Sequence, residues 1–122
     1  RIRIINKFID RNKMNKLFSN YNMFISTTRL DSQGITMLEA ISSGLLVAAI
    51  NNTSKEEFIS DMETGVLGDT PKELAEKIIK VTFDKSLYNK ITIAGRKSME
   101  AIDVKVTCKK ELDILKSIAS NK

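Results

Sequence analysis

The sequence contains no histidine and no tryptophan, and it has one cysteine and one proline among its 122 residues. Without histidine, the Ser-His-Asp and Cys-His forms of nucleophilic catalysis are excluded. A zinc site that combines cysteine with histidine is excluded for the same reason. The single cysteine, Cys108, also excludes an internal disulfide scaffold. Because Cys108 falls on an apolar stripe, we expect its side chain to pack in a core.

Long apolar runs are equally scarce. The longest, residues 45–50, is far shorter than the ~20 residues of a membrane-spanning helix. Only 6% of the residues are aromatic while 42% are hydrophobic, so we expect an aliphatic core and exclude wholesale disorder. Residues 1–122 contain no linker or repeat and suit one domain. Because the chain opens on Arg1 and shows no leader, we expect a cytoplasmic, C-terminal part of a longer protein.

Basic residues outnumber acidic ones by 20 to 15, which gives a net charge of +5. This excess favours anionic partners, but the scarcity of aromatic side chains and the lack of a recognised motif argue against nucleic acid. Towards the C-terminus, a basic helix face is predicted from Lys105, Lys109, Lys110 and Lys116. We interpret it as a solvated face, with peripheral contact to acidic lipid at the inner side of a membrane as the alternative.

Apolar segments alternate with helical patterns along the chain. β-branched or continuous apolar stretches predict strands at residues 1–9, 23–26, 45–50 and 65–68. Helical spacing predicts helices at residues 14–21 (capped by Asp10 or Asn12), 34–43 and 55–60, and then three more after a capping box at Thr70-Pro71-Lys72-Glu73. Strands that alternate with helices indicate βαβ units, so we predict an α/β fold with a parallel sheet.

The polar loop at residues 27–33 and the helix after it carry the candidate chemistry. Ligands bind beyond the carboxyl ends of parallel strands, where this loop is expected to lie. The amides of Gly34, Ile35 and Thr36 would form an anion site suited to a diphosphate at the helix end. Glu39 follows one turn later, about 6 Å along the axis, where its carboxylate would accept hydrogen bonds from a ribose. Asp31 would do likewise for a sugar on the far side of the diphosphate.

The same residues fit a purely structural interpretation. Thr36 and Glu39 have the spacing of a capping box, in which Glu39 would bind only backbone amides. Asp31 or Ser32 would then be an ordinary loop or cap residue. The spacing leaves both interpretations open, since one glycine before a helix is a weak signal.

The segment D-S-Q-G-I-T-M-L-E-A, which starts at Asp31 and holds Glu39, resembles the nucleotide-sugar signature of the group 1 glycosyltransferases. In that signature, seven residues separate two acids. Further stretches resemble other elements of the family in the same order: residues 21–25, 43–47, 57–59 and 63–67. The resemblance covers nearly the whole chain. It implies the Rossmann-like, donor-binding C-terminal domain of a GT-B enzyme, with its N-terminal part missing.

The resemblance also implies roles for the signature residues. Asp31 would be the catalytic residue that faces the transferred sugar, the amides of residues 34–36 would hold the diphosphate, and Glu39 would hold the ribose. The implied activity is that of a retaining hexosyltransferase in bacterial polysaccharide or glycolipid synthesis. Its donor would be a UDP- or GDP-sugar, its acceptor a glycan or a lipid-linked glycan, and neither a metal nor another cofactor is expected. Because the N-terminal domain is absent, we expect these 122 residues to be inactive alone.

Two residues depart from the family pattern. Asp31 stands where glutamate is commoner, and Glu56 stands where a proline usually precedes Glu57. The alternative to an enzyme is a nucleotide-binding or protein-interaction module that has kept the fold and lost the transfer activity.

The edges of the predicted sheet carry a further expectation. In a Rossmann-like sheet, two other strands lie between those predicted at residues 1–9 and 23–26, and this chain contains neither. Each of the two predicted strands would therefore expose an unpaired edge. We expect a rearranged N-terminus or self-association rather than a monomer.

Overall fold

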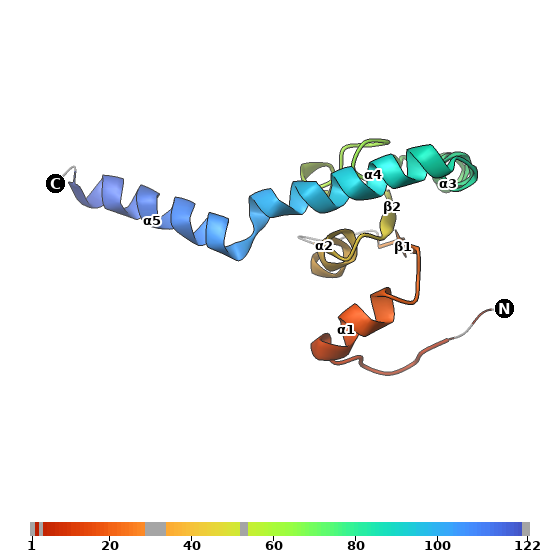
Figure 1. The fold of residues 1–122 in the computed structure, drawn as a ribbon, viewed down its shortest axis with the longest axis horizontal. Helices are drawn as coiled ribbons and strands as arrows, with labels where there is room; N and C mark the ends of the chain where they lie inside the picture. Colours follow the sequence, from red (N-terminus) through yellow and green to blue (C-terminus); the bar gives the residue numbers. More distant parts are fainter. Residues whose placement is uncertain (1, 3, 29–33, 52–53, 121–122) are drawn as a thin grey trace.

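The architecture is a small parallel sheet with helices on both faces and a helical arm at the C-terminal end (Figure 1). The computed structural model describes residues 2, 4–28, 34–51 and 54–120. Its elements follow in the order α1 (Arg11–Phe18), β1 (Met23–Ser26), α2 (Ile35–Ser42), β2 (Leu46–Ile50), the 3-10 helix η1 (Ser54–Glu57), β3 (Val66–Gly68), α3 (Pro71–Phe83), α4 (Lys85–Ser98), the 3-10 helix η2 (Met99–Ile102) and α5 (Val104–Ser120).

The sheet has three parallel strands in the order β1-β2-β3. The central strand, β2, is buried between two separate cores. Val47 and Ala49 face one core together with Phe18 of α1 and Ile41 of α2. The alternate residues of β2 face a second core, which includes Leu74 and Val81 of α3 and Ile91 of α4. Because both faces are covered, the strand reads as a continuous apolar run, as predicted.

Side-chain caps set where three of the helices begin. The amide of Asn12 donates to Asp10 Oδ1 at 2.8 Å at the start of α1. The predicted capping box of α3 is confirmed, since the amide of Glu73 donates to Thr70 Oγ1 at 3.2 Å. The Glu73 carboxylate in turn accepts from the amide of Asp69 at 3.0 Å. Asp84 caps α4 in the same way, through the amide of Leu87 at 2.9 Å.

The strand predicted at residues 1–9 is wrong for the part of that segment that the structure describes. Residues 2 and 4–9 form no regular element, and Ile2, Ile4 and Phe8 are 85–92% exposed. A β-branched composition favours a strand only where a pleated surface can pack against neighbours, and among the described residues no strand pairs with the outer edge of β1. The described part of the N-terminal segment therefore belongs to no strand of the sheet.

Helix α5 forms where it was predicted, but it leaves the body of the molecule. It follows η2 and extends away from the sheet (Figure 1), and none of its residues is buried. Cys108 is exposed, so the prediction that it packs in a core is wrong. The apolar stripe is present, but none of the described residues covers it. Within the described residues, no helix combines the length and the apolar character needed to cross a membrane.

Candidate functional site

The candidate site lies where β1 ends and α2 begins. Strand β1 ends at Ser26, and α2 starts at Ile35 with Gly34 as its N-cap residue. The backbone of Gly34 has φ +56° and ψ +43°, a left-handed conformation that favours glycine because it has no Cβ. Helix α2 is therefore the next element of the chain after the carboxyl end of β1, the edge at which open parallel sheets bind ligands.

The start of α2 presents backbone donors. The first amides of a helix have no acceptor within the helix, and together with the helix dipole they favour an anion. The first turn of α2 contains no acidic residue that would neutralise this end. Ile35 and Thr36 are exposed there. This end of α2 can therefore receive a negatively charged group.

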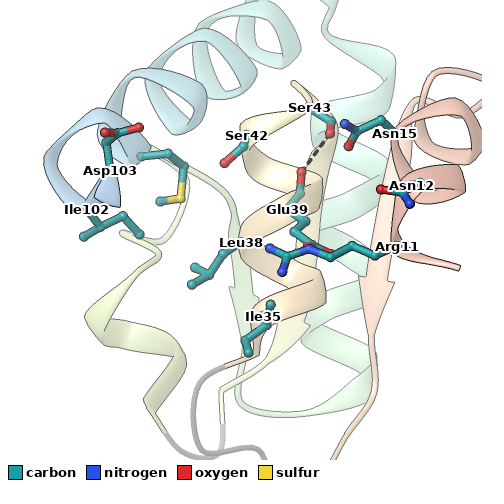
Figure 2. Close-up of a pocket in the computed structure, with 11 residues that line it drawn as sticks. Arg11, Asn12, Asn15, Ile35, Leu38, Glu39, Ser42, Ser43, Ile102 and Asp103 are labelled. Atoms are coloured by element: carbon teal, nitrogen blue, oxygen red, sulfur yellow. Dashed lines mark hydrogen bonds and ion pairs between the residues drawn. The ribbon is translucent and has the colours of Figure 1, made fainter. Parts of the chain in front are cut away.

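Glu39 does not cap its own helix. Because Gly34 is the N-cap residue and makes no side-chain capping bond, Thr36 lies inside α2, and the capping-box interpretation of Thr36 and Glu39 is wrong. The Glu39 side chain instead reaches towards α1, where its Oε1 lies 3.2 Å from Arg11 Nε (Figure 2). The Glu39 side chain is 26% exposed, so a ligand can reach its carboxylate.

Two hollows meet at Glu39. A groove of about 710 Å³ lies along α2 and is bordered by α1, by η2 and by Asp103 (Figure 2). It is lined by Arg11, Asn12, Asn15, Ile35, Leu38, Glu39, Ser42, Ser43, Met99, Ile102 and Asp103. A smaller hollow of about 230 Å³ has a larger share of apolar side chains in its lining than the groove has. It is lined by Phe8, Ile9, Arg11, Met14, Ile35, Thr36 and Glu39. Arg11, Ile35 and Glu39 line both, so a ligand held by Glu39 has space on either side.

The predicted site residues are only partly covered by the structure. Gly34, Ile35, Thr36 and Glu39 lie together on the first turns of α2, as the spacing predicted. Asp31, the predicted catalytic residue, lies outside the described residues.

No pattern in the sequence pointed to two charged residues that the structure places near the site. Arg11 meets Glu39 from a different helix. Lys55 of η1 is only 2% exposed, and its Nζ donates to the carbonyl oxygens of Thr28 at 2.9 Å and Ile50 at 3.2 Å. Lys55 thereby joins the chain just after β1 to the end of β2. Its polar surroundings in the sequence, N-N-T-S-K-E-E, are typical of a surface loop.

Within the described part of the chain, the ionisable groups with clearly shifted pKa values lie away from α2. The hydrogen bond from Lys77 lowers the pKa of Glu73, and hydrogen bonds to Asp61 and Glu73 raise the pKa of Lys77. Burial raises the pKa of Tyr88, whose hydroxyl donates to the Asn22 carbonyl at 2.7 Å. These groups attach α3 and α4 to the sheet. Among the described residues, no three His, Cys, Asp or Glu side chains are grouped so that they could hold a metal ion.

Two curated proteins are similar in sequence to this chain. Sucrose-phosphate synthase of Spinacia oleracea is 28% identical over 97 residues, which are 78% of the chain and 9% of the synthase. The GtfA subunit of the UDP-N-acetylglucosamine–peptide N-acetylglucosaminyltransferase of Streptococcus parasanguinis is 25% identical over 81 residues, which are 66% of the chain and 16% of the subunit. The chain thus spans only a small part of these relatives.

Solved structures share the fold. The C-terminal domain of a glycosyl transferase group 1 family protein (LpcC) from Francisella tularensis has a TM-score of 0.69 at 23% identity, over 80% of this chain and 51% of that one. A variant of S. aureus TarM, solved with fondaparinux, α-GlcNAc-glycerol and UDP, has a TM-score of 0.73 at 23% identity, over 83% of this chain and 21% of that one. At this identity the similarity establishes the α/β fold of GT-B glycosyltransferases.

The family described as glycosyl transferases group 1 matches residues 4–98. The match includes the start of α2 together with Arg11, Glu39 and Lys55. It also covers all three strands of the sheet. On this match, and on the shared fold, the chain belongs to the group 1 glycosyltransferase family.

Proposed function

We propose that the chain is the donor-binding part of a retaining glycosyltransferase that uses a nucleoside-diphosphate sugar, such as a UDP- or GDP-sugar. The observation that carries the proposal is the arrangement of α2. Its amide-bearing end, with Ile35 and Thr36 exposed, lies one helical turn from the accessible carboxylate of Glu39, and both border a hollow.

Each part of such a donor meets a complementary group. The diphosphate would accept hydrogen bonds from the amides at the start of α2. The ribose hydroxyls would donate to Glu39, about 6 Å further along the helix. The apolar side chains of Phe8, Ile9 and Met14 in the smaller hollow offer a surface for the base. UDP is present in the TarM structure, and UDP-N-acetylglucosamine is in the name of the GtfA relative, which supports a uridine nucleotide.

The proposed chemistry follows from this placement. The bond from the anomeric carbon to the diphosphate oxygen breaks, and a bond to a hydroxyl oxygen of a glycan or lipid-linked acceptor forms on the same face of the sugar. The proton of that hydroxyl passes to the leaving diphosphate. The amides at the start of α2 would stabilise the negative charge that develops on the leaving diphosphate. Asp31 would face the transferred sugar, as the family signature implies. An N-terminal domain would supply the acceptor site, and we expect no metal to be required.

Calorimetric titration of the full-length protein with UDP and GDP tests the proposal. Glu39→Ala removes the ribose acceptor, and we expect it to weaken nucleotide binding by about 1–3 kcal/mol. Glu111→Ala is the matched control, because Glu111 is also a helical glutamate but lies on the exposed arm α5. An unchanged affinity of Glu39→Ala would contradict the proposed site. Binding without sugar transfer would favour a nucleotide-binding module over an enzyme.

A further inference from the structure

Arg11 takes part in the site although it belongs to another helix. It is the first residue of α1, and its Nε lies 3.2 Å from Glu39 Oε1. Figure 2 shows the Arg11 side chain extending from α1 across to α2, and it lines both hollows that meet at Glu39. Among the described residues, Arg11 is the only side chain that forms an ion pair with the Glu39 carboxylate.

A contribution to folding does not explain this ion pair. The Arg11 side chain is 84% exposed, and ion pairs between solvent-exposed side chains add little to stability because water screens the charges and the side chains lose freedom. Its position next to a candidate ligand-binding carboxylate requires a different explanation.

The charge of Glu39 creates a difficulty for the proposed donor. A carboxylate one helical turn from a bound diphosphate is repelled by it, because both groups are negatively charged. This repulsion weakens the affinity of the site for the nucleotide. A guanidinium in contact with the carboxylate offsets this repulsion. The contact also restricts the orientation of the carboxylate, because Arg11 Nε lies 3.2 Å from one of its two oxygens, Oε1.

We propose that Arg11 is a positioning residue for Glu39 in nucleotide recognition. Arg11 holds Oε1 so that Oε2 points to the ribose hydroxyls, and its charge keeps the ionised carboxylate compatible with the neighbouring diphosphate. This inference rests on the proposed function of the site. It predicts that Arg11 determines how strongly the protein distinguishes a ribose from a deoxyribose, although it need not touch the ribose itself.

The test compares UDP with 2′-deoxy-UDP and 3′-deoxy-UDP by calorimetric titration of the full-length protein. The measured quantity is the ratio of the dissociation constants of each deoxy compound and UDP, because a general loss of affinity leaves this ratio unchanged. For wild type we expect a ratio of about 10 or more for at least one deoxy compound, as follows from one lost hydrogen bond to a charged group. For Arg11→Met we expect that ratio to fall at least about threefold.

Three further variants make the test specific. Lys13→Met removes a positive charge from the same exposed helix without touching Glu39, and should leave the ratio unchanged. Arg11→Lys keeps the charge and should retain part of the discrimination. In a Glu39→Gln background, Arg11→Met should have no further effect on the ratio, because the charge that Arg11 positions is gone.

Each outcome decides between the proposals. An unchanged ratio in Arg11→Met, or an equal loss of affinity for UDP and both deoxy compounds, would overturn the role of Arg11 and leave the donor site intact. A wild-type protein that binds neither UDP nor GDP would overturn the proposed function, and the role of Arg11 would fall with it. If the ratio falls as much in Lys13→Met as in Arg11→Met, the effect is due to the lost positive charge alone, and the inference would likewise be overturned.

Discussion

Lys55 is a charged side chain inside the protein. Its ammonium group donates to the carbonyl oxygens of Thr28 and Ile50 at the carboxyl edge of the sheet. A buried charge is tolerated only where hydrogen bonds replace its hydration. Lys55 therefore fixes the two strand ends from which the loops around the candidate site leave the sheet.

Replacing Lys55 should lower stability. We expect Lys55→Met to reduce the free energy of unfolding by about 2–4 kcal/mol, because two carbonyl acceptors lose their donor while the apolar stem is kept. Urea denaturation followed by circular dichroism measures the change. Lys80→Met, at an exposed position in the last turn of α3, is the control and should stay within about 0.5 kcal/mol of wild type. An equal effect of the two substitutions would contradict a structural role for Lys55.

Lys77 makes stability depend on pH. Its Nζ lies 2.6 Å from Glu73 Oε1 and 2.7 Å from Asp61 Oδ2, and it donates to the Leu67 carbonyl at 2.7 Å. The hydrogen bond from Lys77 holds the pKa of Glu73 below its ordinary value of 4.5. A carboxyl whose pKa is lowered by folding stabilises the folded state above its unfolded pKa, and this contribution is lost as the pH falls through the folded pKa. For Lys77, whose pKa is raised above 10.5, the loss comes at alkaline pH.

The pH dependence gives a measurable signature. We expect Lys77→Met to have a lower melting temperature than wild type at neutral pH. The difference should narrow as the pH falls below 4.5, where Glu73 becomes protonated in the unfolded and then in the folded state. Thermal unfolding between about pH 7 and pH 3 provides the comparison. A difference that stays constant over this range would assign the effect of the substitution to packing rather than to the ion pair.

At the scale of the helices and strands, the local patterns predicted most of the fold. The strand predicted from residues 45–50 and the predicted capping box of α3 are both present. A strand buried on both faces requires a continuous apolar segment, and a helix cap requires particular residues at fixed positions, so both can be recognised in the sequence. The predictions of a strand at residues 1–9 and of a core position for Cys108 were wrong for the same reason. A pattern shows which residues favour burial, but whether another segment covers them is decided by the rest of the protein.

In the candidate site, too, the features set by local sequence could be predicted, whereas contacts between distant segments could not. Residues 34–36 and Glu39 belong to one helix, so their relative placement follows from helix geometry alone. The partners of Glu39 and Thr28 lie elsewhere in the chain. Arg11 comes from α1, and Lys55 is 27 residues from Thr28. Such contacts exist only after the helices have packed, and no spacing in the sequence predicts them.

Helix α5 should be dispensable for the stability of the 122-residue chain. None of its residues is buried, so deleting residues 104–120 removes no core contact, and we expect the free energy of unfolding to change by less than about 1 kcal/mol. Denaturant titrations of the full and shortened chains measure the difference at a concentration at which both are monomeric. A larger loss would show that α5 folds back onto the sheet in solution. Rapid hydrogen exchange along α5, compared with α4, provides an independent readout.

For the molecule as a whole, exposed apolar surface predicts association between copies. Ile2, Ile4 and Phe8 are largely exposed, Ile25 is half exposed on the edge strand β1, and among the described residues no strand pairs with the outer side of β1. Open strand edges and apolar patches are templates for pairing with a second chain. We therefore expect the 122-residue chain to self-associate as its concentration rises.

Light scattering across a concentration series, together with hydrogen exchange on residues 4–9, tests this expectation. A mass that increases with concentration, with protection of those amides at high concentration, is the expected result. A mass that stays at 13.7 kDa with the amides unprotected would contradict it. In that case the N-terminal segment would be frayed in solution.

The helical arm also determines how a single copy behaves as a particle in solution. A compact chain of 122 residues has a radius of gyration of about 14 Å. Helix α5 has 17 residues, which correspond to a length of about 26 Å, and it points away from the sheet (Figure 1). X-ray scattering from a dilute solution should therefore give a larger radius and a pair-distance distribution with a long tail. Rotational diffusion should be anisotropic. In NMR measurements, amides whose N–H bonds lie parallel to the long axis of the molecule should therefore relax at different rates from amides whose N–H bonds lie perpendicular to it.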